Sequence, residues 1–185
     1  MGCSSFLEFM IPYFYNLNKS LFSESLIEEV THLVSNRLDS FVAMVGKDVS
    51  FDGNNYYYNN ELKEIPEINS FMKKCSLQCY PLIMLHKPNS SVIKHTDSLK
   101  NKRNTVIITP LSPNSTYSPT YFWTNKEDTV PLVICNFSKN ESVLFNTQKI
   151  HSLINDSNEY RIGLQICFNE PFETILNLYQ NGKLI

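Results

Sequence analysis

A histidine and an aspartate stand two positions apart at the end of a strand-like run, in "IKHTDS" at positions 93–98. Residues i and i+2 of a β-strand lie on the same face, so we expect His95 and Asp97 to point the same way. Two imidazole nitrogens and one carboxylate, on one face of an octahedron, leave the opposite positions open and suit non-haem Fe(II). The pair predicts a metal site that needs one more histidine. Taken alone, it could also be a solvent-exposed turn.

His151 is the candidate for the third ligand among the four histidines. It begins a strand-like segment, and the turn-like "NDSNE" that follows predicts a hairpin. The hairpin would bring Arg161 back beside the strand that carries His151. We expect His86, on the strand before the metal pair, to line the pocket or to have a structural role rather than to bind the metal.

The segment 161–168, "RIGLQICF", has two different faces. Arg161, Gly163 and Gln165 share one face, and large apolar side chains alternate with them on the other. This pattern predicts the wall of a polar pocket in which the glycine leaves space, and it predicts that the strand is not buried throughout. Arg161 is then a candidate anion-binding residue. The alternative is a surface ion pair with Glu159 or Asp156, which would contribute little.

The elements that would carry these residues differ between the two halves of the chain. Ser25 and Glu28 form a possible capping box, and apolar residues then recur at helical spacing up to Leu38. A second helix is predicted from Pro66. The turn-rich stretch 52–60, "DGNNYYYNN", is expected to be irregular.

From about residue 80 the sequence changes to short β-branched and aromatic runs separated by Pro, Asn and Ser. We predict eight strands, in "YPLIMLHK", "SVIKHTD", "RNTVIITPL", "TYFWTN", "VPLVICNF", "ESVLFNT", "HSLIN" and "YRIGLQICF". The predicted fold class is therefore mainly β with N-terminal helices packed on one sheet of a jelly-roll-like, cupin-class barrel. The last residues, "YQNGKLI", contain an Asn-Gly turn signal and predict a final hairpin.

Length and composition limit the classes of protein to consider. A chain of 185 residues with 42% hydrophobic content and no visible linker predicts a single domain. The formal net charge is −2 and the pI about 6.1, which argues against a nucleic-acid or anionic-membrane partner. The apolar runs are far shorter than the roughly 20 residues of a membrane span. We expect a cytoplasmic protein with reduced thiols.

His95-x-Asp97, a long interval, His151 and then Arg161 resemble the Fe(II)- and 2-oxoglutarate-dependent oxygenases. With "HTDSLKNKRNTVIITPLSP", the chain looks like their prolyl-hydroxylase-like or aspartyl/asparaginyl-hydroxylase-like branch. The resemblance implies a double-stranded β-helix over 80–170, helical support in 1–79 and a C-terminal extension in 171–185. It also implies that the three ligands hold Fe(II), that Arg161 holds the far carboxylate of 2-oxoglutarate, and that O2 is consumed.

Other contacts follow from the resemblance with alternatives left open. Arg103 would bind a carboxylate of cosubstrate or substrate, or else be a solvated residue at the start of a strand. Gln165 would donate a hydrogen bond in the pocket. Tyr121 and Trp123 would contact the substrate, or else be core or rim aromatics. The tyrosine that the family often places on the strand before the metal motif is absent, and only His86 stands there.

The implied reaction is hydroxylation of a C–H bond in a protein side chain, an amino acid or a small metabolite, with release of succinate and CO2. One alternative is a cupin-type metal enzyme that does not use 2-oxoglutarate, which would give Arg161 no task. Another is a catalytically silent β-barrel binding module in which the histidines are incidental. Uptake of metal by the purified protein would separate this last possibility from the other two.

Overall fold

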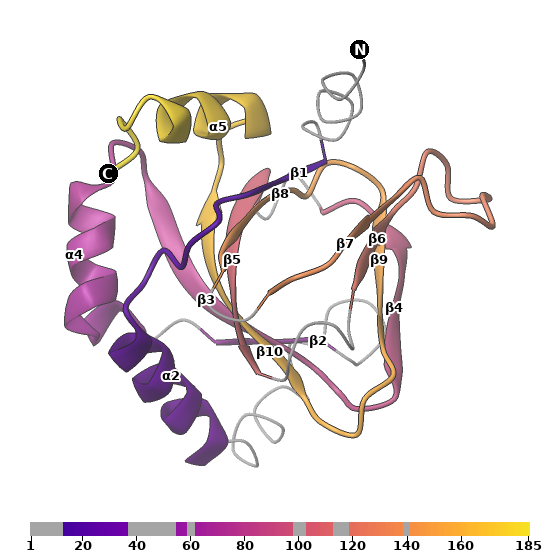
Figure 1. Cartoon of the computed structure of the whole chain (residues 1–185), viewed down its shortest axis with the longest axis horizontal. Helices are drawn as coiled ribbons and strands as arrows, with labels where there is room; N and C mark the ends of the chain where they lie inside the picture. The colour runs from indigo at the N-terminus through magenta and orange to yellow at the C-terminus, as the bar shows by residue number, and fades with distance from the viewer. Residues whose placement is uncertain (1–12, 37–54, 59–61, 98–102, 113–118, 139–140) are drawn as a thin grey trace.

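Two antiparallel sheets face each other, and the helices lie together on one side of them (Figure 1). The computed structural model describes residues 13–36, 55–58, 62–97, 103–112, 119–138 and 141–185. The six-stranded sheet has the order β1-β8-β5-β10-β3-β2, and the four-stranded sheet has the order β4-β9-β6-β7. The predicted fold class, a mainly β barrel with supporting helices, is therefore confirmed.

All eight strands predicted beyond residue 79 are present. Their bounds are β3 Cys79–His86, β4 Ser90–His95, β5 Thr105–Ser112, β6 Thr120–Phe122, β7 Val133–Cys135, β8 Val143–Asn146, β9 His151–Asn155 and β10 Arg161–Phe168. Consecutive strands alternate between the sheets in part of the chain: β3 lies in the large sheet, β4 in the small one and β5 in the large one again. Residues from both sheets therefore meet in the space between them.

Two further strands belong to the large sheet and were not predicted. β1 (Phe14–Asn16) pairs with β8, and β2 (Asn55–Tyr58) pairs with β3 at the edge of the sheet. The expectation that 52–60 is irregular is wrong for 55–58, and 52–54 and 59–60 lie outside the described residues. A strand of three or four residues is too short to show alternation, and its partner is remote in sequence, so pairing rather than pattern defines it.

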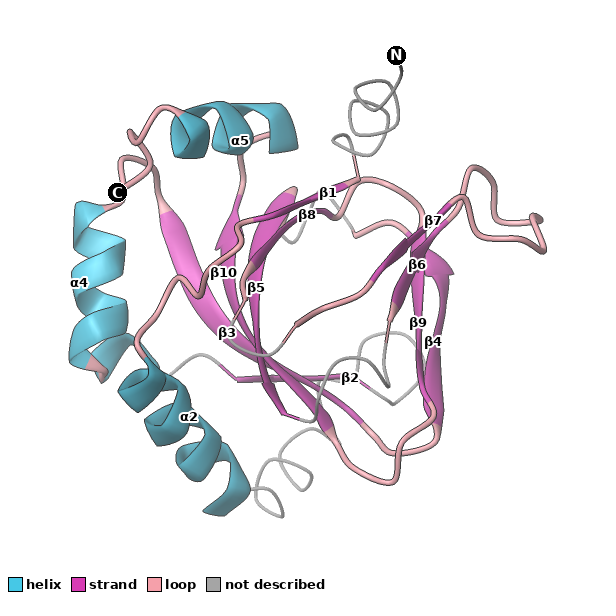
Figure 2. Cartoon of the chain, viewed as in Figure 1, coloured by secondary structure: helices cyan, strands magenta, loops and turns pink. Residues whose placement is uncertain are grey.

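The helices lie against the outer face of the large sheet (Figure 2). They are α2 (Glu24–Asn36), the short 3-10 helix η2 (Leu62–Glu64), α4 (Pro66–Lys74) and α5 (Phe172–Gln180). The helices predicted from residue 25 and from Pro66 are thus confirmed, and the predicted end of the first at Leu38 lies outside the described residues. None of the helices in the described part of the chain is long and apolar enough to cross a membrane.

The N-terminal cap of α2 is Ser23, not the predicted Ser25. The Leu26 amide donates to the Ser23 hydroxyl oxygen at 3.3 Å, which is how a serine cap satisfies a free amide of the first turn. The Ser23 amide donates to the Glu67 carboxylate at 2.7 Å, which ties the start of α2 to α4. The capping box expected from Ser25 and Glu28 therefore starts two residues too late.

The C-terminus forms a helix rather than the predicted hairpin. Gly182 has a φ of 62°, and the Lys183 amide donates to the Leu178 carbonyl at 2.8 Å, beyond the end of α5. Asn-Gly thus ends a helix here. Helix ends and tight hairpin turns both need a positive φ, so the dipeptide alone does not distinguish them.

Apolar side chains gather in two layers, one between the helices and the large sheet and the other between the two sheets. β10 contributes to both, because Leu164 and Ile166 face the helices while Cys167 faces the small sheet. All eight residues of β10 are buried. The expectation of partial exposure is wrong because the small sheet covers the face that carries Arg161 and Gln165.

A buried asparagine links two connections at one end of the barrel. The Asn155 side-chain amide donates to the carbonyls of His86, Lys87 and Glu159 at 3.2, 2.8 and 2.9 Å. Its oxygen accepts a hydrogen bond from the Ser157 hydroxyl at 2.8 Å. Asn155 therefore fixes the end of β3 relative to the turn between β9 and β10.

Candidate active site

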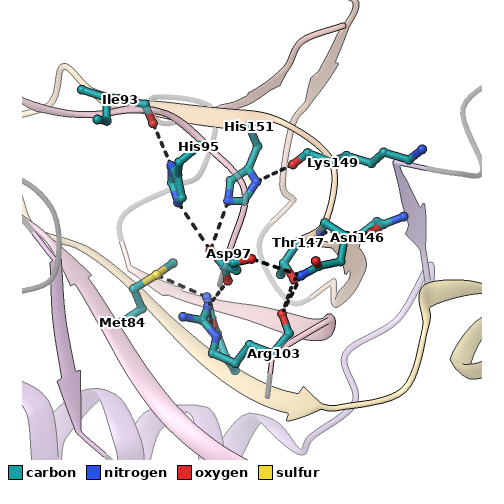
Figure 3. A network of polar contacts seen from close by, with 11 residues as sticks. Met84, Ile93, His95, Asp97, Arg103, Asn146, Thr147, Lys149 and His151 are labelled. Carbon is teal, nitrogen blue, oxygen red and sulfur yellow. Dashed lines mark hydrogen bonds and ion pairs between the residues drawn. The ribbon is translucent and has the colours of Figure 1, made fainter. Parts of the chain in front are cut away.

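His95, Asp97 and His151 converge between the sheets (Figure 3). β4 and β9 are adjacent, and His95 lies directly opposite His151 in the pairing. Asp97 follows the end of β4, where its amide donates to the Thr147 carbonyl at 3.0 Å. The Asp97 Oδ1 atom lies 3.4 Å from His95 Nε2 and 3.8 Å from His151 Nε2. One ligand atom from each residue lies within 4.8 Å of the others, close enough for a single metal ion.

Backbone carbonyls orient both imidazole rings. Nδ1 of His95 lies 2.7 Å from the Ile93 carbonyl, and Nδ1 of His151 lies 2.8 Å from the Lys149 carbonyl (Figure 3). A carbonyl only accepts, so each ring carries its proton on Nδ1. Each Nε2 lone pair is then directed to the shared centre, which is the orientation that a metal ligand needs.

Burial and neighbouring charge set the protonation of the three side chains. Burial lowers the pKa of His151 to about 4, so this ring is neutral at pH 7. Burial also lowers the pKa of His95, but the Asp97 carboxylate and the Ile93 carbonyl raise it more, and the net shift is upward. Burial raises the pKa of Asp97, but His95 and Arg103 outweigh this and lower it. Two imidazoles and an ionised carboxylate fit a divalent ion that accepts nitrogen and oxygen ligands.

Arg103 lies beside Asp97 rather than in solvent. Its guanidinium is 3.3 Å from Asp97 Oδ2 and donates to Gln165 Oε1 at 2.8 Å. The Thr147 hydroxyl donates to the Arg103 carbonyl. The solvated alternative is wrong, because Arg103 is buried. Its contacts orient the Asp97 carboxylate, and binding of a ligand carboxylate by Arg103 stays a prediction.

Arg161 is a buried cation. It is 8% exposed, donates to the Thr120 hydroxyl at 3.3 Å, and has its guanidinium carbon 5.0 Å from the centre of the Phe137 ring. No ion pair joins it to a carboxylate of the described residues, Glu159 and Asp156 included, and burial lowers its pKa to about 10. A buried charge without a counter-ion is costly, so this guanidinium is suited to receive an anion.

Arg161 and the three candidate ligands line one cavity of about 40 Å³. The other residues around it are Met84, His86, Val92, Arg103, Val106, Ile108, Thr120, Phe145, Thr147, Ser152, Leu153 and Gln165. Gln165 lines the cavity and its amide nitrogen lies 3.4 Å from the Met84 sulfur, while donation of a hydrogen bond to a ligand stays a prediction. Thr120 and Thr147 were missed, since no pattern distinguishes a threonine that faces a cavity from any other strand threonine.

Tyr121 and Trp123 do not line this cavity. Tyr121 lies between Thr120 and Phe122, which are both buried, so alternation puts its side chain on the other face of the small sheet. The Trp123 indole nitrogen donates to the Ser152 hydroxyl at 2.9 Å, and the Lys94 ammonium lies 3.8 Å from the ring centre. Contact of either residue with a substrate stays a prediction.

No family model matches the sequence, and no curated protein matches it in sequence. Solved structures do share the fold. A prolyl-4-hydroxylase from Pseudomonas putida has a TM-score of 0.61 at 10% identity, covering 89% of this chain and 97% of that one. EvdO2 from Micromonospora carbonacea var. aurantiaca, complexed with 2-oxoglutarate, has a TM-score of 0.57 at 15% identity, covering 90% and 89%.

HygX from Streptomyces hygroscopicus, with nickel and 2-oxoglutarate bound, has a TM-score of 0.51 at 11% identity, covering 90% of this chain and 86% of that one. At such identities the likeness concerns the path of the chain and not its chemistry. The chain has the double-stranded β-helix fold of the Fe(II)- and 2-oxoglutarate-dependent oxygenases.

Proposed function

We propose that this protein is an Fe(II)- and 2-oxoglutarate-dependent oxygenase that hydroxylates a C–H bond of a protein side chain, an amino acid or a small metabolite. The observation that carries the proposal is the presence, in one cavity, of a two-histidine, one-carboxylate set and a buried arginine with no ion-pair partner among the described residues. The first would hold the metal and the second a carboxylate. Structures of the same fold that contain 2-oxoglutarate support this.

The metal would be held by Nε2 of His95, Nε2 of His151 and a carboxylate oxygen of Asp97. Fe(II) and 2-oxoglutarate, when bound, supply the oxidising power that turns O2 and a C–H bond into a hydroxyl group, with succinate and CO2 as products. The protein supplies the fixed ligands. Arg103 keeps the Asp97 carboxylate ionised and oriented, and the two backbone carbonyls keep the imidazole rings in place.

Arg161 would bind the far carboxylate of 2-oxoglutarate. Its planar guanidinium can donate two parallel hydrogen bonds to a carboxylate, and its burial strengthens such an ion pair relative to one in water. The bound anion would also supply the counter-charge that the described residues do not. A cupin-type enzyme that does not use 2-oxoglutarate would leave this buried charge without a function.

The test is cosubstrate binding and turnover by Arg161→Met, with Arg161→Lys as the matched control. Met keeps much of the apolar stem and removes the charge, whereas Lys keeps the charge and loses the fork. Loss of one partner of a buried charge pair costs about 2 to 5 kcal/mol, so affinity for 2-oxoglutarate should fall roughly 30-fold or more in Arg161→Met and less in Arg161→Lys.

The measurements are anaerobic calorimetric titration of 2-oxoglutarate into Fe(II)-loaded protein, and succinate formation with panels of small metabolites and peptides. Fe(II) affinity without cosubstrate should be the same in both variants and the wild type. If Arg161→Met kept the wild-type dependence of succinate formation on 2-oxoglutarate concentration, the carboxylate would be bound elsewhere, and Arg103 would be the next candidate.

A further inference from the structure

His86 is a buried histidine whose ring makes no hydrogen bond within the described structure. The residue is 3% exposed, and neither Nδ1 nor Nε2 has a hydrogen-bond partner among the described residues. Almost all buried polar side chains in folded proteins are paired. An unpaired imidazole that lines a cavity is therefore a candidate contact for a ligand in that cavity.

The position of His86 relative to Arg161 indicates which part of a ligand it would reach. β3 and β10 are neighbours in the large sheet, and His86 is the direct partner of Arg161 in their pairing. Directly opposed residues point to the same side of a sheet, with Cβ atoms about 4.5 to 5.5 Å apart. Both side chains line the same cavity. His86 and Arg161 thus form one end of it.

The other polar side chains near this end each make at least one hydrogen bond within the protein. Gln165 accepts from Arg103 and lies against the Met84 sulfur, and the Thr120 hydroxyl accepts from Arg161. His86 is also outside the set of residues that could share a metal ion in the described structure, which consists of His95, Asp97 and His151. Its ring is therefore available to a ligand, and the metal does not require it.

A hydrogen bond fixes the backbone of His86, and the ring itself is neutral. The Asn155 amide donates to the His86 carbonyl at 3.2 Å, at the end of β3. Burial, together with the nearby Arg161, lowers the pKa of His86 well below its usual value, so the ring is neutral. A neutral imidazole has one N–H donor and one acceptor nitrogen. A carboxylate beside Arg161 could accept that N–H.

We propose that His86 is a second donor to the carboxylate bound by Arg161, so that the two residues together select a 2-oxo acid with a carboxylate at its far end. This inference rests on the proposed function, because it assumes that 2-oxoglutarate occupies the cavity. His86 is then a binding residue that distinguishes the dicarboxylate from a monocarboxylate of the same length. It does not act on the reacting atoms.

The experiment compares His86→Phe with the wild type, using two titrants and anaerobic Fe(II)-loaded protein. Phe keeps an aromatic ring and removes both nitrogens. The titrants are 2-oxoglutarate and 2-oxopentanoate, which has the same five-carbon chain and lacks the far carboxylate. Calorimetry should show affinity for 2-oxoglutarate about tenfold or more lower in His86→Phe, as for a lost hydrogen bond to a charged group. Affinity for 2-oxopentanoate should change less than about twofold.

Three controls accompany this experiment. Cys79→Ser, a change at the other end of β3 and outside the lining of the cavity, should leave both affinities close to the wild type. The melting temperature of ligand-free His86→Phe should equal or exceed that of the wild type, because the variant no longer buries unpaired nitrogens. His86→Gln, which restores an N–H donor, should recover part of the affinity for 2-oxoglutarate.

The outcomes are distinguishable. If the wild type binds Fe(II) but not 2-oxoglutarate, the proposed function is wrong and the inference falls with it. If the wild type binds 2-oxoglutarate and His86→Phe binds it equally well, the inference alone is wrong. An equal loss of affinity for both titrants would also overturn it, because His86 would then act on the 2-oxo acid end.

Discussion

Two buried polar regions lie next to each other in this barrel, one around Asn155 and one in the cavity beside it. They differ in how many of their polar atoms have a hydrogen-bond or ion-pair partner. Asn155 is 0% exposed, and its amide and carbonyl bond to Ser157 and to three backbone carbonyls. The cavity next to it contains an unpaired His86 ring and an Arg161 with no carboxylate partner among the described residues. Asn155 donates a hydrogen bond to the backbone carbonyl of His86, so His86 belongs to both regions.

The difference separates groups that stabilise the fold from groups kept for a ligand. A paired buried amide contributes net stability, whereas an unpaired buried group costs about 1 to 3 kcal/mol. Removing Asn155 should therefore destabilise the protein, and removing the unpaired cavity groups should not. At Asn155 a substitution should lower the stability of the protein. In the cavity a substitution should leave or raise the stability of the ligand-free protein and lower its affinity for the ligand.

The largest effect on stability is expected for Asn155→Ala. Three backbone carbonyls lose a donor in a buried place, so we expect the free energy of unfolding to fall by about 2 to 4 kcal/mol. Urea denaturation followed by circular dichroism measures it. Asn158→Ala, which changes an exposed asparagine in the same turn, is the control and should stay within about 0.5 kcal/mol. Equal stability of the two variants would show that the Asn155 bonds contribute nothing.

The next effect is the loss of a metal ligand, in His95→Ala or His151→Ala. Fe(II) affinity should fall at least tenfold, as even a change outside the ligands typically weakens a metal site by 10- to 100-fold. Both variants should keep the fold, because apolar packing holds the strands together. Calorimetric metal titration and the circular dichroism spectrum test the two statements, and wild-type metal affinity in both variants would remove these residues from the site.

The pH dependence of metal affinity should show that metal binding displaces a single proton, the one on His95. The pKa of His95 is raised above 6.5, so below that pKa the metal must displace a proton from this ring. The pKa of His151 is about 4, so this ring needs no deprotonation at higher pH. Affinity should fall about tenfold per pH unit between about pH 6.5 and pH 4.5. A competition titration with a chromophoric chelator measures the slope, and a hundredfold fall per unit would mean that both rings are protonated.

The smallest effect is a gain in stability of the ligand-free protein in Arg161→Met. The change removes a buried charge that no ion pair compensates among the described residues, so the free energy of unfolding should rise by about 1 kcal/mol. The same variant should bind 2-oxoglutarate more weakly, which would sharpen the contrast with Asn155. A clear loss of stability without ligand would place Arg161 among the structural groups.

The sequence predicts the elements with strong local patterns. Alternation in "RIGLQICF" predicts that Arg161 and Gln165 line the cavity, and the spacing of His95 and Asp97 predicts the metal pair. Gly163, which alternation puts on the same face, is not part of that lining, and a Cβ there would lie 3.4 Å from Ile108 Cγ2. The strand β1 could not be predicted, because it is defined by its pairing with β8, far away in the chain. The Asn-Gly dipeptide at the C-terminus predicts a hairpin but ends a helix, because helix ends and hairpins share the same backbone requirement.

The contacts that complete the site are harder to predict than its ligands. Sequence reasoning leaves Arg103 either as a ligand for a carboxylate or in solvent, and the structure buries it beside Asp97, which follows β4 in the other sheet. The His86 ring is unpaired because, among the described residues, no polar side chain from another strand lies within hydrogen-bond distance of it. Sequence patterns describe only residues that are close along the chain. Both facts required the register of the strands.

Each candidate metal-binding histidine donates a hydrogen bond to the backbone carbonyl two residues earlier, which affects how the site tolerates amino-acid substitutions. Every amino acid offers a backbone carbonyl, so substitutions at Ile93 or Lys149 leave the acceptor in place. The acceptor that orients each ring therefore does not depend on the side chain at position 93 or 149, unlike the contact that orients the Asp97 carboxylate beside Arg103. Positions 93 and 149 can therefore change in sequence while each imidazole keeps its hydrogen-bond acceptor.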